Sequence, residues 1–210
     1  MIACSAGNHA QGVALAATSM GIKSVVCMPD GAPLMKVEST KRLGGGLLAG
    51  VAFAIKSLRP DVKIYGVQAA GAASMYNAYR DHTYETLDHV DTFADGIAVK
   101  TPGETTFKMI EQYVDGIVTV SEDEIAAAIL ALMENQKLVA EGAGATPVAA
   151  ALFGKLPIEG KKTVCLISGG NIDVNILSRV ITRGMIMSGR KTNLMIALED
   201  KPGQLTRVSE

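Results

Sequence analysis

The sequence is poor in the features that mark nucleic-acid-binding and membrane proteins. Trp is absent and aromatic residues make up only 4% of the 210 residues, which disfavours a platform for stacking bases. Basic and acidic residues nearly cancel to a net charge of −1, so no clustered positive field is expected. No apolar run approaches the ~20 residues of a membrane span, and the N-terminus shows no signal-peptide pattern. We therefore expect a cytoplasmic protein with no nucleic-acid and no membrane partner.

Cysteine is scarce as well. Cys4, Cys27 and Cys165 lie in apolar runs, and no C-x-x-C spacing is present, which excludes zinc ribbons and thioredoxin-like motifs. Buried, reduced thiols are the simplest interpretation. The rest of the composition, with 48% apolar and 20% charged residues, is that of a folded chain with a sizeable core.

Short apolar runs alternate with helical patterns along most of the chain, which predicts an α/β fold with a mostly parallel sheet covered by helices on both faces. The expected strands are Met1–Cys4, Ser24–Met28, Val62–Gln68, Val118–Val120, Thr163–Ile167 and Asn193–Leu198. The expected helices are Ala10–Met20, part of Gly31–Leu43, Leu47–Leu58, a helix to about Leu138, Gly144–Phe153, Ile172–Thr182 and one after Gly203. Ser121 and Glu124 have the S-x-x-E spacing of a capping box.

One junction breaks this alternation. A helix-like segment ending at Leu43 runs directly into Gly44-Gly45-Gly46, with no strand between them. Because glycine loops that bind anions normally follow a strand and precede a helix, we expect that residues are absent at this junction.

Three loops precede helices in the pattern, namely Ser5–Gln11, Gly44–Leu47 and Ser168–Asn171. In α/β sheets ligands bind at the carboxyl ends of strands, where helix N-termini offer free N–H groups. Such loops suit a ligand with a phosphate and a carboxylate. Each loop alone also has an ordinary explanation. Gly44–Leu47 can be a plain glycine turn, Ser168–Asn171 can be a tight turn with an Asn cap, and His9 can be a cap or a packed side chain.

Taken together, the three loops resemble the signature loops of fold-type II pyridoxal-phosphate enzymes, and most closely those of the threonine ammonia-lyase (threonine dehydratase) family. The resemblance extends to Phe93–Val99 and Thr101–Gly103, and Ala197–Leu205 resembles the start of an amino-acid-sensing ACT domain. It implies four parts: residues 1–43 in a small domain, 44–182 in a large cofactor-binding domain, 183–191 as a linker and 192–210 as the start of the ACT-like domain.

The resemblance also implies roles for individual residues. The substrate carboxylate would bind the loop containing Ser5, Ala6, Asn8 and His9, and Asn8 would also bond the phenolic oxygen of pyridoxal 5'-phosphate. The cofactor phosphate would bind the segment Gly44, Gly45, Gly46 and Leu47. Ser168 would face the pyridine nitrogen.

Three positions depart from patterns within the family. Serine racemases of this family have a serine where Ala6 stands, so Ala6 favours a lyase over a racemase. Members with a divalent-metal site have carboxylates where Gln68 and Ser74 stand, so we predict no divalent metal. The Schiff-base lysine of the family lies in a Phe-Lys context before the Ser5 loop, whereas Phe107-Lys108 is the sole such pair here, in a predicted helix. We interpret Lys108 as a surface lysine, and expect the chain to lack the Schiff-base lysine and to be inactive as written.

The implied function is that of an L-threonine and L-serine ammonia-lyase that gives 2-oxobutanoate or pyruvate, and ammonia. A serine dehydratase or racemase of the same fold and a non-catalytic remnant are the alternatives. The resemblance further implies a homo-oligomer and an allosteric effector at the ACT-like segment. A catabolic role and a role in isoleucine biosynthesis both stay open.

Overall fold

The computed structural model describes residues 2–4, 25–27 and 46–209. Strands β1 (Ile2–Cys4) and β2 (Val25–Cys27) form one parallel pair. Strands β3 (Tyr65–Ala69) and β4 (Gly116–Val120) form a second parallel pair, in which Tyr65 stands opposite Gly116. The expectation of parallel strands is therefore confirmed for both pairs.

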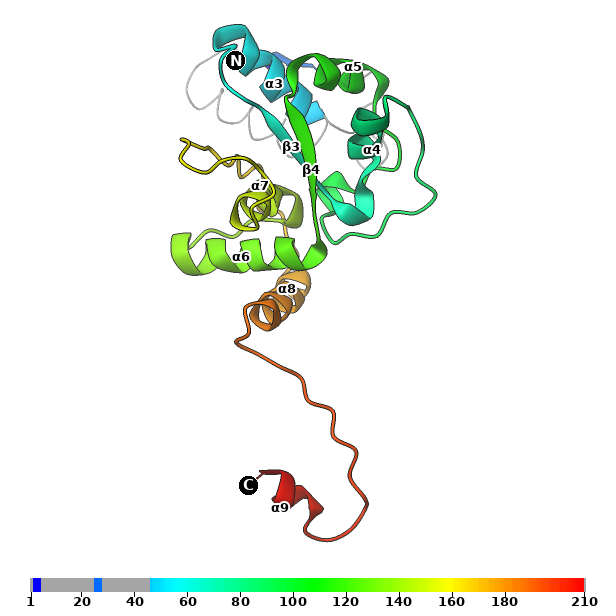
Figure 1. The fold of residues 1–210 in the computed structure, drawn as a ribbon, viewed down its shortest axis with the longest axis vertical. Coiled ribbons are helices and arrows are strands. Elements are labelled where there is room, and N and C mark those ends of the chain that lie inside the picture. The colour runs from blue at the N-terminus through cyan, green and yellow to red at the C-terminus, as the bar shows by residue number, and fades with distance from the viewer. Residues whose placement is uncertain (1, 5–24, 28–45, 210) are drawn as a thin grey trace.

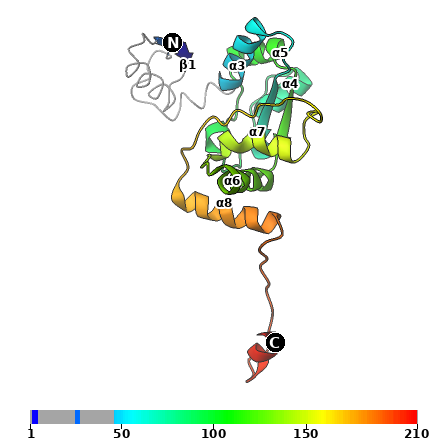
Figure 2. The same cartoon turned by 90° about the vertical axis from the view of Figure 1, so that its left-hand side faces the viewer.

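Helices cover both faces of the β3–β4 pair (Figure 1). One side carries α3 (Gly46–Leu58), α4 (Ser74–Asp81) and α5 (Glu104–Tyr113). The other side carries α6 (Glu122–Gln136), α7 (Gly142–Leu152) and α8 (Val174–Met187). Figure 2 shows α6 between α7 and α8, in agreement with its contacts to both. Two 3-10 helices, η1 (Ala70–Ala72) and η2 (Asp95–Ile97), and the short α9 (Gln204–Ser209) complete the described elements.

The period-2 alternation of β4 divides the core into two clusters. Ile117 packs with the apolar residues of α3 and α5, whereas Val118 and Val120 pack with those of α6 and α7. On the first side, α3 approaches β3 so closely that a Cβ on Gly66 would lie 2.5 Å from Leu48 Cδ2. Both faces of the pair are thus buried, as the sequence pattern predicts.

The capping box expected at the start of α6 is present. Ser121 Oγ accepts a hydrogen bond from the Glu124 N–H at 3.2 Å, and the Ser121 N–H donates to Glu124 Oε2 at 2.8 Å. These two bonds satisfy backbone donors that have no partner inside the helix, and so they fix where α6 begins.

The predicted end of the last long helix at Thr182 is wrong, because α8 continues to Met187, into the segment 183–191 expected to be a linker. Gly184 does not end the helix but lets it approach α6, since a Cβ there would lie 3.0 Å from the Ala126 carbonyl oxygen. The preceding Arg183 pairs with Asp123 on α6. Packing against α6 therefore extends the helix beyond the point that local sequence suggests.

Two predicted strands are also absent. Thr163–Ile167 and Asn193–Leu198 have no ladder partner among the described residues, and their apolar side chains face solvent, with Val164 92% and Met195 101% exposed. A strand is defined by the neighbour that bonds its backbone. Neither segment has one in the described part of the chain.

Beyond α8 the chain runs away from the helices and strands and ends in α9 (Figures 1 and 2). Across the described residues, no helix is both long and apolar enough to cross a membrane. Cys165 is a free, half-buried thiol whose Sγ contacts the Pro147 carbonyl oxygen at 3.6 Å, and burial raises the pKa of this thiol.

Candidate functional site

The N-terminus of α3 is one of the expected anion-binding positions that the structure describes. Gly46 begins the helix and, like Leu47, is exposed to solvent. The first turn contains no acidic side chain. The first N–H groups of a helix have no intrahelical acceptor and carry a partial positive charge, so this end of α3 favours an anion.

The loop Ser168–Asn171 is the second described position, and it leads through Asp173 into α8. Ser168 is exposed. The loop is held from the start of α7, because the Glu141 N–H donates to the Gly169 carbonyl oxygen at 3.1 Å and Glu141 Oε2 accepts from the Asn171 N–H at 3.0 Å. The exposed serine therefore precedes a backbone that is fixed by hydrogen bonds.

Glycines permit this close contact between the loop and α7. A Cβ on Gly144 would lie 2.7 Å from the Gly169 carbonyl oxygen, and a Cβ on Gly169 would lie 2.5 Å from Glu141 Oε1. Real Cβ atoms do not approach other atoms so closely. The packing therefore requires glycine at position 144, where the neighbour is backbone, whereas a side chain at position 169 would displace the Glu141 carboxylate.

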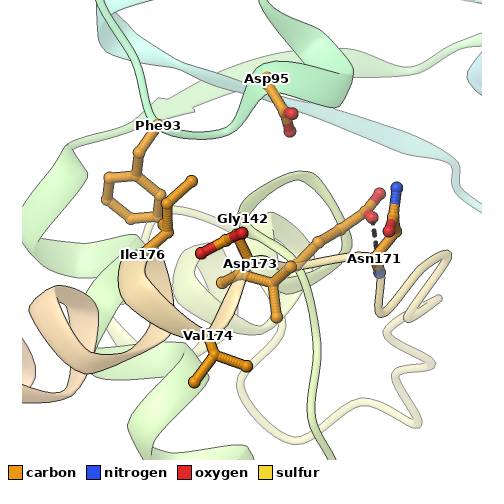
Figure 3. A pocket seen from close by; sticks show the side chains of 9 residues that line it. Phe93, Asp95, Gly142, Asn171, Asp173, Val174 and Ile176 are labelled. Carbon is orange, nitrogen blue, oxygen red and sulfur yellow. Dashed lines mark hydrogen bonds between the residues drawn. The ribbon is translucent and has the colours of Figure 1, made fainter.

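A pocket of about 470 Å³ opens beside this loop (Figure 3). Asn171 and Asp95 line it from different elements, with Phe93 and Ile176 on an apolar side. Asp173 also lines it while capping α8, since Asp173 Oδ1 accepts from the Asn175 N–H at 2.7 Å. The pocket joins the Phe93–Val99 motif to the Ser168–Asn171 loop, although the two are far apart in the sequence.

The predicted site residues fall into two groups. Ser5, Ala6, Asn8, His9, Gly44 and Gly45 lie outside the described residues. Gly46, Leu47 and Ser168 are described, and none of them lines the pocket beside Asn171. The expectation that the three loops converge on one ligand stays a prediction.

Gln68 and Ser74 both form hydrogen bonds within the fold. Gln68 Oε1 accepts from the Tyr76 N–H at 2.8 Å, and the buried Ser74 donates from Oγ to the Val99 carbonyl oxygen at 2.8 Å. In the described part of the chain, no group of three or more His, Cys, Asp or Glu side chains is placed to hold a metal ion.

The interpretation of Lys108 as a surface lysine is confirmed. It lies on α5 with its side chain 70% exposed, and its Nζ pairs with Glu104 at 2.8 Å.

Sequence reasoning missed Glu141. The pattern Glu141-Gly142-Ala143-Gly144, in which two glycines open a helix, could have indicated it, because such glycines often mark a close approach of backbone. Its partner loop lies 30 residues further along the chain. Only the folded structure shows that the carboxylate reaches that loop.

Comparison with known proteins shows the family of the chain. Residues 43–170 match the family described as "Pyridoxal-phosphate dependent enzyme". The L-threonine ammonia-lyase of Thermotoga maritima is 40% identical, with 98% of this chain and 67% of the relative covered. The L-threonine ammonia-lyase of Geobacter sulfurreducens is 36% identical, with 100% of this chain and 68% of the relative covered.

The first of these alignments spans 269 residues, more than the 210 of the whole chain, so part of the relative stands opposite gaps in this one. The expectation that residues are absent at the Leu43–Gly44 junction stays a prediction. Among solved structures, the processed form of threonine deaminase isoform 2 from Solanum lycopersicum is 29% identical with a TM-score of 0.65, covering 87% of this chain and 73% of that one. The chain therefore belongs to the fold-type II pyridoxal-phosphate-dependent enzymes.

Proposed function

We propose that this chain is the cofactor-binding part of an L-threonine ammonia-lyase, which converts L-threonine to 2-oxobutanoate and ammonia and L-serine to pyruvate and ammonia. The observation that carries the proposal is the 40% identity to a relative named L-threonine ammonia-lyase, which extends over 98% of this chain. Similarity over so much of the chain includes both the small N-terminal region and the helices around β3 and β4.

The described residues fit the phosphate of the cofactor. The exposed start of α3 offers N–H groups without intrahelical acceptors, and no acidic side chain in the first turn repels an anion. Apart from the adjacent backbone, no atom of the described residues lies within 4 Å of the position that a Cβ on Gly46 would occupy, so a ligand can approach the backbone there. We assign phosphate binding to Gly44, Gly45, Gly46 and Leu47.

Ser168 fits the pyridine nitrogen because it presents an exposed hydroxyl ahead of a fixed loop. When bound, the cofactor withdraws electrons from the carbon that bears the substrate amine. A neutral hydroxyl does not hold the ring nitrogen protonated as a carboxylate would. Ser168 therefore weakens this withdrawal and favours prompt loss of the β-hydroxyl over transamination.

The loop Ser5–His9 is assigned to the substrate carboxylate, with Ser5, Ala6, Asn8 and His9 as its binding residues. Ala6 has no proton to deliver to the second face of the substrate, which supports a lyase rather than a racemase. We assign residues 1–43 to the small domain and 44–182 to the large domain.

The C-terminal segment is assigned to the start of an ACT-like domain at residues 192–210. Its support is the exposure of Leu194, Met195 and Ile196, which have the apolar character of a strand and which no sheet of the described residues covers. A homo-oligomer and an allosteric effector at this segment are part of the same proposal.

The test is titration of the protein with pyridoxal phosphate, followed by addition of L-threonine. We expect the cofactor to bind, and its absorption to change with L-threonine and L-serine more than with their D-enantiomers. Reduction with borohydride should attach no cofactor specifically to Lys108, because its Nζ lies on the surface in an ion pair with Glu104. Failure to bind pyridoxal phosphate would favour the non-catalytic remnant, and accumulation of D-serine would favour the racemase.

A further inference from the structure

Glu141 occupies the position just before α7, yet its side chain does not cap that helix. Its backbone is extended, with φ −74° and ψ 165°, and the carboxylate accepts no hydrogen bond from the first turn of α7. Residues at this position commonly use a side-chain oxygen to satisfy the free N–H groups of their own helix. Here the carboxylate is directed to a different element.

That element is the Ser168–Asn171 loop, which Glu141 holds at two points. Its N–H donates to the Gly169 carbonyl oxygen at 3.1 Å, and its Oε2 accepts from the Asn171 N–H at 3.0 Å. The two bonds bracket Gly170, and the Ile172 N–H closes the turn on the Gly170 carbonyl oxygen at 3.0 Å. One residue therefore fixes both sides of the turn that follows Ser168.

The carboxylate lies in a space that glycines leave open. A Cβ on Gly169 would stand 2.5 Å from Glu141 Oε1, and one on Gly96 would stand 3.4 Å from the same atom. Any larger residue at position 169 would displace the carboxylate. The site for this side chain is thus formed by η2 on one side and by the loop on the other.

We propose that Glu141 is the residue that positions Ser168, by holding the loop through the Asn171 N–H. The role of Ser168 toward the cofactor ring rests on the proposed function, whereas the anchoring of the loop does not. Loss of the Glu141 carboxylate releases the Asn171 N–H and lets the turn move, so that Ser168 no longer stands at a fixed place. The start of α3 makes no use of Glu141, and its anion binding is therefore independent of this anchor.

The first experiment uses the cofactor-free protein and measures hydrogen exchange of the Asn171 amide by NMR. In Glu141→Ala we expect exchange about tenfold faster, the effect of losing one hydrogen bond to a charged acceptor. Glu141→Gln keeps an amide oxygen as acceptor and should retain most of the protection. Asp173→Ala is the matched control, because it removes the cap of α8 and leaves the Glu141 bonds in place. Unchanged exchange of the Asn171 amide in Glu141→Ala would overturn the proposal.

The second experiment compares dissociation constants for pyridoxal phosphate and for inorganic phosphate. In Glu141→Ala we expect pyridoxal phosphate to bind about tenfold more weakly, while inorganic phosphate binds as before. Glu141→Gln should restore most of the affinity for pyridoxal phosphate. Equal weakening of both ligands would contradict a positioning role. If the unsubstituted protein binds no pyridoxal phosphate, the proposed function fails, and the exchange measurement still decides whether Glu141 anchors the loop.

Discussion

Lys56, near the end of α3, and Asp115, just before β4, are joined by an ion pair of 2.7 Å in which both side chains are largely buried. Lys63 Nζ contacts the other oxygen of Asp115 at 2.8 Å, and the Ile64 N–H donates to the carboxylate at 2.8 Å. One carboxylate thus connects the C-terminal end of α3 to the entry of β3 and β4. The basic residue also lies where the helix dipole favours a positive charge.

The Asp115 cluster predicts a loss of stability at acidic pH. Partial burial alone would raise the pKa of Asp115, but hydrogen bonds from Lys56, Lys63 and the Ile64 N–H outweigh it and hold the pKa well below its usual range. Because the pKa of Asp115 is lower in the folded than in the unfolded state, the ionised carboxylate adds to the free energy of unfolding. This contribution is complete above the unfolded-state pKa of about 3.9 and falls as the pH drops below it. Urea denaturation between pH 7 and pH 2 should show this decline, and it should be smaller in Asp115→Asn.

The same substitution has a consequence at neutral pH. Asp115→Asn should lower the free energy of unfolding by about 2 kcal/mol, because a charged acceptor of several hydrogen bonds is lost. Asp61→Asn is the control, since Asp61 and its partner Arg59 are both exposed and the substitution should leave stability unchanged. Equal effects of the two substitutions would contradict a special role for Asp115.

The capping box of α6 gives a second prediction. Ser121→Ala should lower stability by about 1 kcal/mol, because the Glu124 N–H loses its acceptor. Ser121→Asp retains an oxygen that can accept this bond and should recover most of the loss. Thermal unfolding followed by circular dichroism measures both, and a stable Ser121→Ala protein would argue that the box contributes little.

Two glycines in helices should respond in opposite ways to alanine. Gly144→Ala forces a Cβ to within 2.7 Å of the Gly169 carbonyl oxygen and should destabilise the protein by about 1–3 kcal/mol. Gly50→Ala, in α3, meets no atom within 4 Å and should stabilise the protein by up to about 1 kcal/mol. Denaturation curves of the two variants measure these changes in stability. If the Ser168–Asn171 loop does not pack against α7, Gly144→Ala should not destabilise the protein.

Ser168→Asp tests whether residue 168 faces the ring nitrogen of the cofactor. A carboxylate at this position should hold the pyridine nitrogen protonated, whereas the serine hydroxyl should not. We expect the nitrogen NMR signal of isotope-labelled pyridoxal phosphate bound to the protein to move to that of a protonated ring in Ser168→Asp. The matched variant Ser168→Thr keeps the hydroxyl and should show no such change. An unchanged signal in Ser168→Asp would count against the assigned role of Ser168.

Local sequence predicted the elements whose causes are local. The S-x-x-E spacing located the start of α6, and the β-branched run at Val118–Val120 located most of β4. Phe107-Lys108 was correctly placed on a helix surface. In each case the information lies within a few residues of the feature it determines.

Features that depend on distant partners were missed. The sequence of Thr163–Ile167 is that of a strand, but the described residues offer it no neighbour. The helix that the sequence predicts to end at Thr182 runs on to Met187, because Gly184 allows close contact with Ala126 on α6. Glu141 was missed because its acceptor role depends on a loop brought beside it by the fold.

The exposed segment Thr163–Ile167 has a consequence for handling the protein. A run rich in β-branched and aliphatic residues, with Val164 and Leu166 open to solvent, can pair as a strand with the same run of further copies. Concentrated solutions should therefore develop thioflavin-binding fibrils with time, and replacing Val164 with lysine should delay their appearance.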